Sequence, residues 1–400
     1  DLYESHAEEF FALLTHEAGK TLSDCIGELR EAVDFLRYYA HQAEALASNS
    51  DGIFTCISPW NFPLAIFTGQ IAAALAIGNG VLAKPAEATS LIAVQATALL
   101  HQAGVPKTCL QLLPGEGAVV GPVLCSAPNV SGVCFTGSTA TAQAINRVMA
   151  ENLPPQTPLI AETGGLNAMI VDSTALLEQA VQDVVVSAFQ SAGQRCSALR
   201  MLYVQSDIAD AFERMLCGAM QALLVGPPEA ADCDVGPVID AATQARISAH
   251  IARHKLVFQT SAPENGYFVA PTILSVSGMS DLHAEIFGPV LHLARYDAGD
   301  LDHVIEDINA SGYGLTFGCH SRIDDRVQKV VSRVNVGNLY INRNQIGAVV
   351  GSQPFGGHGL SGTGPKAGGP RYLPRFAAQR RMTAEGPLPP QMNLAEIEQA

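Results

Sequence analysis

Apolar residues recur at helical spacing over residues 4–47, as in the segment CIGELREAVDFLRYYA at 25–40. A repeat of three to four residues predicts helices that pack one apolar face against a core. Shorter apolar runs, each closed by proline or glycine, then alternate with longer helical patterns. The predicted strands are 52–59, 81–85, 110–117 and 130–138, and the predicted helices are 62–77 and 88–104. This β-α-β-α order predicts a parallel sheet with crossover helices.

After the segment ETGG at 162–165 the alternation starts again. The predicted elements are a strand at 168–172, a helix at 176–193, a strand at 200–205 and a helix at 208–223. Residues 226–270 show little regular pattern, and glycine is dense from 337 to 369. We therefore expect an α/β protein with one α/β domain at 1–164, a second at 165–345, a return segment at 346–376 and a tail at 377–400.

Composition and charge fit a globular enzyme. Hydrophobic residues make up 48% of the chain, charged residues 15%, and the formal net charge is −15. This charge argues against a surface for nucleic acid or anionic lipid, because both bind clustered Lys and Arg. No apolar run reaches the roughly 18 residues of a membrane span, and no signal peptide is recognisable. The nine cysteines contain no CxxC pair, which predicts reduced thiols and a cytoplasmic protein.

The segment GQRCSA at 193–198 carries the strongest chemical signal. It presents Cys196 after a flexible glycine, downstream of Glu162 in ETGG. Covalent catalysis on a carbonyl needs a thiolate that attacks and a carboxylate that later takes a proton from water. The alternatives are a buried structural cysteine and a structural glutamate. A weaker signal is FTGS at 135–138, where the backbone N–H groups of Gly137 and Ser138 open a helix and could face a pyrophosphate; no GxGxxG motif is present.

Several motifs in one order resemble the aldehyde dehydrogenases. They are SPWNFP at 58–63, KPAE at 84–87, FTGS, ETGG, GQRCS, EIFGPV at 285–290 and PFGGHGLSGTG at 354–364. Longer segments, such as CISPWNFPLAIFTGQ at 56–70 and GTGPKAGGP at 362–370, resemble the L-glutamate γ-semialdehyde (Δ1-pyrroline-5-carboxylate) dehydrogenases. The nearest likeness is to the dehydrogenase module of the bifunctional proline utilization A proteins.

The resemblance implies an aldehyde dehydrogenase fold, with a Rossmann-like NAD-binding domain at 1–164 and an α/β catalytic domain at 165–345. It implies NAD-dependent oxidation of L-glutamate γ-semialdehyde to L-glutamate in proline catabolism. It also implies a homo-oligomer and a proline dehydrogenase module upstream in the same polypeptide. Any peripheral membrane contact would come from that upstream module. The absent initiator Met suggests such a longer polypeptide and an N-terminally incomplete cofactor domain. Residues 224–266 look shortened against the family, and the chain diverges after Phe376.

The catalytic roles implied by the resemblance fall on three residues. Cys196 forms a thiohemiacetal with the aldehyde and then a thioester, and Glu162 activates the water that hydrolyses it. The side-chain amide of Asn61, together with the backbone N–H of Cys196, holds the developing oxyanion. No metal is implied.

The implied cofactor site has an adenosine end and a nicotinamide end. Lys84 and Glu87 reach the adenosine ribose, where a carboxylate favours NAD over NADP because it repels a 2′-phosphate. Glu285 and Phe287 position the nicotinamide ribose and ring. The full predicted set is Ile57, Trp60, Lys84, Glu87, Gly117, Gly137, Ser138, Glu285 and Phe287.

The implied substrate site binds a carboxylate at one end of an aliphatic chain. Ser197, Gly347 and Ala348 hold the carboxylate, the last two on a glycine-bearing anchor loop, and Phe62 and Phe355 form aromatic walls. The alternatives are an aldehyde dehydrogenase for another aldehyde, a catalytically silent or truncated scaffold, and a thiol-based sensor without turnover.

Overall fold

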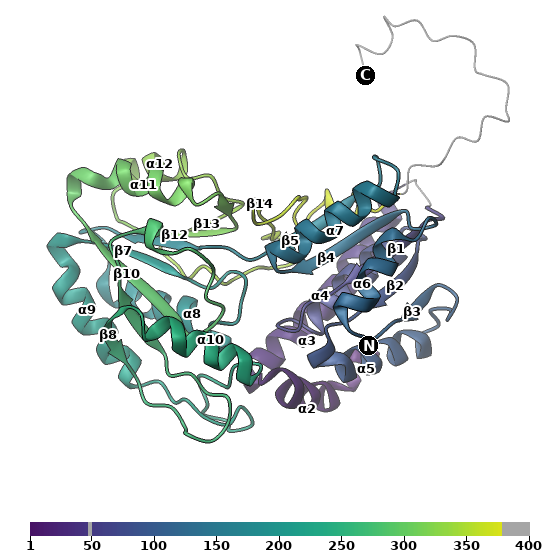
Figure 1. Cartoon of the computed structure of the whole chain (residues 1–400), viewed down its shortest axis with the longest axis horizontal. Helices are drawn as coiled ribbons and strands as arrows, with labels where there is room; N and C mark the ends of the chain where they lie inside the picture. The colour runs from purple at the N-terminus through teal and green to yellow at the C-terminus, as the bar shows by residue number, and fades with distance from the viewer. Residues whose placement is uncertain (47–49, 378–400) are drawn as a thin grey trace, which may run out of the picture.

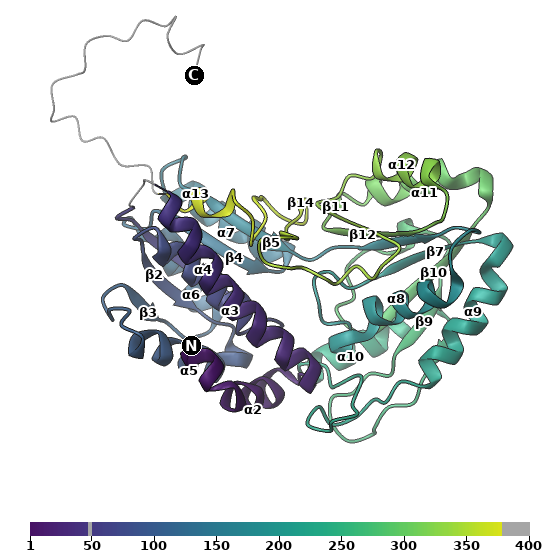
Figure 2. The same ribbon diagram turned by 180° about the vertical axis from the view of Figure 1, so that it is seen from behind.

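A computed structural model describes residues 1–46 and 50–377 of the chain. Two mainly parallel sheets lie side by side, each covered by helices on both faces, and a small two-stranded sheet lies between them (Figure 1). The first sheet is built from the N-terminal part of the chain and the second from the central part. The last described segment returns from the second sheet to the first, where its end packs on helices of the first domain (Figure 2).

The first sheet has the strand order β3-β2-β1-β4-β5, and all neighbours are parallel. Its strands are β1 Ile53–Ile57, β2 Gly80–Lys84, β3 Leu110–Leu112, β4 Gly132–Gly137 and β5 Leu159–Thr163. The chain order reverses between β1 and β4. In open α/β sheets ligands bind at such a reversal, beyond the carboxyl ends of the strands. The topology thus places a ligand site beside the residues that follow β1 and β4.

Helices fill both faces of this sheet because its strands carry apolar side chains on alternate sides. Phe54 and Cys134 face the core formed with α1 Leu2–Ser5, α2 Ala7–Ala18, α3 Leu22–Ala45, α4 Ala65–Ala76 and α5 Ser90–Gln102. Val133 and Phe135 face the opposite core, formed with α6 Gly117–Ser126 and α7 Thr139–Asn152. α3 packs along α4 and so forms an outer layer of the domain.

The second sheet has the order β13-β12-β6-β7-β10-β9-β8, parallel except for the edge pair β8 and β9. Its strands are β6 Ala168–Val171, β7 Met201–Gln205, β8 Lys255–Gln259, β9 Thr272–Ser275, β10 Val290–Tyr296, β12 Thr316–His320 and β13 Asn338–Ile341. α8 Leu177–Phe189, α9 Ser206–Gln221 and α10 Ala241–Ile251 bury one face, and α11 Leu301–Ala310 and α12 Asp324–Val331 bury the other.

Short elements complete the chain. A two-stranded antiparallel sheet pairs β11 Tyr313–Gly314 with β14 His358–Gly359, and α13 Tyr372–Arg375 packs on α3 and α4. Single 3-10 turns are η1 Glu87–Thr89, η2 Gln190–Gly193, η3 Met279–Asp281 and η4 Ala298–Asp300. Over the described ranges, no helix is both long enough and apolar enough to cross a membrane.

The predicted parallel α/β architecture and its individual strands and helices are confirmed. Residues 226–270 are the exception, because they contain α10 and β8 where we expected little regular structure. β8 is a partly exposed edge strand, so it lacks the apolar run of a central strand. The first sheet ends at Thr163 and the second begins at Ala168, on either side of the predicted 164/165 boundary. Of the predicted tail at 377–400, residues 378–400 lie outside the described residues.

Candidate active site

The candidate nucleophile lies on a strained turn between α8 and β7. Ser191, Ala192 and Gly193 all have left-handed backbone angles, with φ of 56°, 53° and 64°. At Gly193 a β-carbon would lie 2.2 Å from the carbonyl oxygen of Gly288, so only glycine fits there. Left-handed non-glycine residues cost free energy and persist where the surroundings hold them in place. The turn therefore brings the backbone at Gly193, shortly before Cys196, into close contact with the backbone of Gly288.

Two buried side chains fix the backbone around Cys196. The Asn167 side-chain amide donates to the carbonyl oxygens of Cys196 and Ala198, at 2.6 and 2.9 Å. The fully buried Arg200 guanidinium donates to the carbonyl oxygens of Gly193, Arg195 and Gly288 and forms an ion pair of 3.1 Å with Glu285. The hydrogen bonds to these three carbonyls measure 2.7, 3.0 and 3.1 Å, respectively. Such support from side chains behind a site holds the reacting group in one geometry.

Cys196 lies where two cavities meet, because its side chain lines both of them. Burial, together with the negative charges of Glu285 and Glu162, raises the pKa of the Cys196 thiol to about 12, while Arg195 acts in the opposite direction. The thiol is therefore protonated at neutral pH and must lose its proton before or during attack, since the thiolate is the nucleophile.

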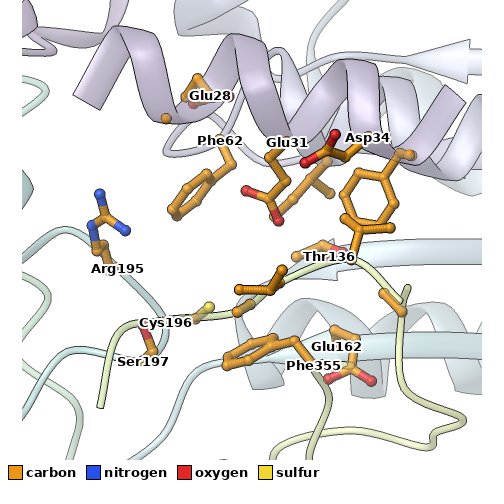
Figure 3. Close-up of a pocket in the computed structure, with 18 of the residues that line it drawn as sticks. Glu28, Glu31, Asp34, Phe62, Thr136, Glu162, Arg195, Cys196, Ser197 and Phe355 are labelled. Atoms are coloured by element: carbon orange, nitrogen blue, oxygen red, sulfur yellow. The ribbon is translucent and has the colours of Figure 1, made fainter. Parts of the chain in front are cut away.

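Glu162 is the penultimate residue of β5 rather than part of a turn. Its Oε2 accepts a hydrogen bond of 3.0 Å from the Gly357 N–H, and Oε1 has no hydrogen-bond partner within the described residues. A β-carbon at Gly356 would lie 2.7 Å from Oε1, so a glycine is needed beside the carboxylate. Burial raises the pKa of Glu162 well above its usual value, and the Gly357 hydrogen bond and the Lys366 charge only partly offset this. In Figure 3 the carboxylate points away from the sulfur of Cys196.

Asn61 follows β1 and reaches the nucleophile turn from the first domain. Its side-chain N–H donates to the Gln194 carbonyl oxygen at 3.1 Å, two residues before Cys196. Asn61 and Cys196 line the same cleft. An amide nitrogen carries two protons, so one N–H remains for a group bound at Cys196.

A cleft of about 1220 Å³ runs along the reversal point of the first sheet and ends at Cys196. All the predicted cofactor residues line it, namely Ile57, Trp60, Lys84, Glu87, Gly117, Gly137, Ser138, Glu285 and Phe287. The N-terminus of α7 opens into this cleft, capped by the Ser138 hydroxyl, which accepts from the Thr141 N–H at 3.1 Å.

The two ends of the cleft differ in chemistry. At one end the Lys84 ammonium lies 3.5 Å from the Glu87 carboxylate, which also accepts from the Gly117 N–H. At the other end, next to Cys196, the rings of Trp60 and Phe287 meet edge to face with centroids 5.5 Å apart. One end is thus polar and carboxylate-bearing, and the other is aromatic.

The second cavity has a volume of about 310 Å³ and meets the cleft at Cys196. Of the predicted substrate residues, Phe62, Ser197, Ala348 and Phe355 line it. Phe62 and Phe355 lie on opposite walls, with Cys196 to one side (Figure 3). Gly347 is not among its lining residues, although Ile346 and Ala348 on either side are. The Gly347 carbonyl instead accepts from the Tyr340 hydroxyl at 3.0 Å.

The wall opposite Phe355 comes from α3, which the sequence pattern predicted only as a packing helix. Besides Arg30, Phe35 and Tyr39, this helix contributes four acidic residues to the lining of the cavity: Asp24, Glu28, Glu31 and Asp34. Glu28 pairs with Lys20 at 3.1 Å and Asp24 pairs with Arg195 at 2.9 Å. Both cations lie over the Phe62 ring, at 4.1 and 5.3 Å from its centroid.

Glu31 is the acidic residue that points into the middle of this cavity (Figure 3). Burial, followed by the nearby Glu28 carboxylate, raises its pKa to about 7. Residues 24, 28 and 31 are spaced for one helix face, so the pattern of acidic residues was the available signal for a functional surface. Arg200 and Asn167 had no such signal, because most of their partners are backbone carbonyls, which any residue can supply.

Comparison with known proteins agrees with this geometry. A family model described as "Aldehyde dehydrogenase family" matches residues 1–381. The chain belongs to the aldehyde dehydrogenase family.

No group of three or more His, Cys, Asp or Glu residues within 1–46 and 50–377 is placed to hold a metal ion.

Relatives within the family cover nearly all of this chain. "Bifunctional protein PutA" of Klebsiella aerogenes is 54% identical over 96% of this chain, which spans 31% of that protein. "1-Pyrroline-5-carboxylate dehydrogenase" of Bacillus mycoides (strain KBAB4) is 37% identical over 94% of this chain and 78% of that protein. A crystal structure of 1-pyrroline-5-carboxylate dehydrogenase from Thermus with bound NAD superposes with a TM-score of 0.88, at 35% identity over 94% of this chain and 77% of that one. The predicted aldehyde dehydrogenase fold is thereby confirmed.

Proposed function

We propose that this chain carries the catalytic site of an NAD-dependent L-glutamate γ-semialdehyde dehydrogenase that acts in proline catabolism. One observation carries the proposal: the Cys196 thiol is held at the junction of a dinucleotide-sized cleft and a separate small cavity. A hydride transfer needs this arrangement, because the carbon bound to the sulfur must face the cofactor on one side and keep its chain on the other. The names of the relatives supply the substrate.

The residues of the cleft fit NAD. α7 presents its N-terminus, the preferred place for a pyrophosphate, and a β-carbon on Gly137 would lie 2.6 Å from the Phe135 ring, so the turn leaves no room for a side chain. Glu87 and Lys84 would hold the adenosine ribose, and Glu285, fixed by Arg200, would hold the nicotinamide ribose. When bound, NAD accepts the hydride from the substrate carbon.

The chain's own residues then account for the acyl transfer. The Cys196 thiolate attacks the aldehyde carbon, and the oxyanion accepts hydrogen bonds from the Asn61 amide and the Cys196 backbone N–H. After oxidation the acyl group remains on sulfur as a thioester. Glu162 takes a proton from the water that attacks this thioester, and burial, which raises the pKa of the Glu162 carboxyl, makes its carboxylate a stronger base than that of an exposed glutamate.

The second cavity suits a substrate that carries both a carboxylate and an ammonium group. We propose that Ser197 and the anchor loop around Gly347 and Ala348 hold the carboxylate, and that Phe62 and Phe355 enclose the aliphatic chain. Glu31, which points into the cavity from α3, suits the ammonium group. A charge in this cavity without a partner would be costly, so each charged end of the substrate needs its own partner.

The test is the activity of the purified chain with NAD. NADH should form with glutamate semialdehyde, and its catalytic efficiency, kcat/KM, should exceed that for pentanal, a neutral aldehyde of the same length, by about tenfold or more, since charge-assisted hydrogen bonds contribute about 1.5–3 kcal/mol each. Equal efficiency would favour the alternative of an aldehyde dehydrogenase for another aldehyde. An absence of NADH with any aldehyde would favour the silent scaffold or thiol sensor.

We further propose that this segment works in the cytoplasm, as part of a longer polypeptide with a proline dehydrogenase module upstream, and as a homo-oligomer. The support is the name of the PutA relative, which is bifunctional and of which this chain spans 31%. The upstream reading frame tests the first part, and light scattering of the whole polypeptide tests the oligomer.

A further inference from the structure

Gln345 is a fully buried amide directly before the segment 346–350 that lines the substrate cavity. Hydrogen bonds with side chains of α8 fix the backbone at this position. The Gln345 N–H donates to the Ser187 hydroxyl at 3.1 Å, and the N–H of Asn344 donates to the Asp183 carboxylate. Packing on α8 therefore accounts for the position of the backbone and leaves the side chain to be explained.

The side chain of Gln345 reaches across to the nucleophile segment. Its Nε2 lies 3.4 Å from the Ser197 carbonyl oxygen and 3.3 Å from the Thr316 hydroxyl. The Thr316 hydroxyl also donates to the Ser197 carbonyl at 3.2 Å. Ser197 is the residue after the nucleophile and lines the substrate cavity. The amide thus links the two chain segments that bound the carboxylate end of the cavity.

The same set of contacts continues to Cys196. The Thr316 N–H donates to the side-chain oxygen of Asn167 at 3.2 Å, and the Asn167 amide nitrogen donates to the Cys196 carbonyl. Gln345, Thr316, Asn167 and Ser197 are all buried. A continuous buried polar network therefore joins the anchor loop, the start of β12 and the nucleophile turn. Such networks hold one arrangement when their members are paired.

Packing alone gives no reason for an amide at this position. The Oε1 atom of Gln345 has no hydrogen-bond partner among the residues that the structure describes. A buried amide with an unpaired oxygen is less stable than an apolar side chain of the same shape. The contribution of Gln345 is therefore expected in the geometry it imposes rather than in stability.

We propose that Gln345 is a specificity-determining positioning residue that sets the separation between Cys196 and the anchor loop. The inference rests on the proposed function, because it assumes a substrate attached at both places. One end of such a substrate is bonded to sulfur and the other is held by the loop. A shift of the loop by about 1 Å then misplaces the aldehyde, which can lower the rate by about 10²-fold. A neutral aldehyde has no second attachment and tolerates the shift.

The variant Gln345→Met keeps the length of the side chain and removes the amide. The matched control is Gln205→Met, because Gln205 is also buried but bonds Asp207 and Ser173 at the far end of β7. Parent and variants are assayed with glutamate semialdehyde, its one-carbon-shorter homologue aspartate semialdehyde, and pentanal. A thermal melt of each protein reports folding.

We expect Gln345→Met to lower kcat/KM for glutamate semialdehyde by about 10- to 100-fold, mainly through kcat, and to change kcat/KM for pentanal by less than about threefold. Its preference for the longer semialdehyde over the shorter should also fall. Gln205→Met should leave every ratio unchanged. Should Gln345→Met fail to fold, Thr316→Val decides, because it removes another member of the network and should shift the same ratios in the same direction.

Unchanged ratios in both network variants, or equal losses on charged and neutral aldehydes, would overturn the inference, since Gln345 would then be merely structural. A parent enzyme that does not prefer glutamate semialdehyde to pentanal would instead refute the proposed function, and the inference with it. The parent assay and the variant assays therefore separate the two failures.

Discussion

The cofactor cleft and the substrate cavity share Cys196 but are assembled in different ways. The cleft is lined mainly by turns that directly follow consecutive strands of one sheet, so its residues lie beside their own motifs. The cavity brings together α3, the turn after β1, the nucleophile turn and the loop at 346–355. A site built from local turns can be recognised in the sequence, whereas a site built from distant segments depends on how the chain packs.

Replacing the shared residue should separate the two halves most strongly. Cys196→Ala removes the nucleophile, so turnover should fall by more than about 10⁴-fold, while the Kd for NAD changes less than about twofold because the thiol does not hold the cofactor. Steady-state rates and a fluorescence titration with NAD measure both. Residual activity within tenfold of the parent would refute the assignment of Cys196.

Glu162 tests the step that follows hydride transfer. Glu162→Gln should still give a burst of NADH, since acylation precedes hydrolysis, while the steady rate falls by about 10²–10⁴-fold. Stopped-flow absorbance resolves the two phases. An equal loss of burst and steady rate would mean that Glu162 also removes the thiol proton.

The pH dependence of the free thiol tests the electrostatics at the junction. With a pKa of about 12, the thiolate fraction of Cys196 should rise about tenfold per pH unit between 7 and 9. The rate of Cys196 alkylation by iodoacetamide in cofactor-free protein, followed by peptide mass spectrometry, should rise in proportion. A plateau below pH 8 would contradict the raised pKa.

Ser197 sharpens the comparison on the substrate side. Ser197→Ala should raise KM for glutamate semialdehyde about tenfold, because one charge-assisted hydrogen bond is lost. It should barely change KM for pentanal or for NAD. Paired assays on both aldehydes give the ratio. If kcat/KM falls equally for both aldehydes, Ser197 supports Cys196 rather than binding the substrate carboxylate.

Glu87 gives the smallest effect and tests the cofactor side. Glu87→Gln removes the charge that would repel a 2′-phosphate, so the preference for NAD over NADP should fall by about three- to tenfold while KM for the aldehyde is unchanged. Initial rates with both dinucleotides measure it. An unaltered preference would place the discrimination elsewhere in the cleft.

The sequence by itself determined the parallel α/β architecture, because central strands of such sheets are continuous apolar runs that alternate with helical patterns. Its short motifs also predicted Cys196, Glu162 and the cofactor residues, and the structure brings these residues together around the cleft and the cavity beside it. It missed β8, whose exposed edge carries no such run.

Only the tertiary structure decided the rest of the site. It made α3, which reads as a packing helix, a wall of the substrate cavity that carries four acidic residues, left Gly347 outside the cavity lining, and joined Gln345 and Arg200 to the carbonyls around Cys196. Hydrogen bonds to backbone carbonyls place no demand on the identity of the accepting residue. Such pairs therefore leave no pattern in the sequence, and only the folded structure brings them together.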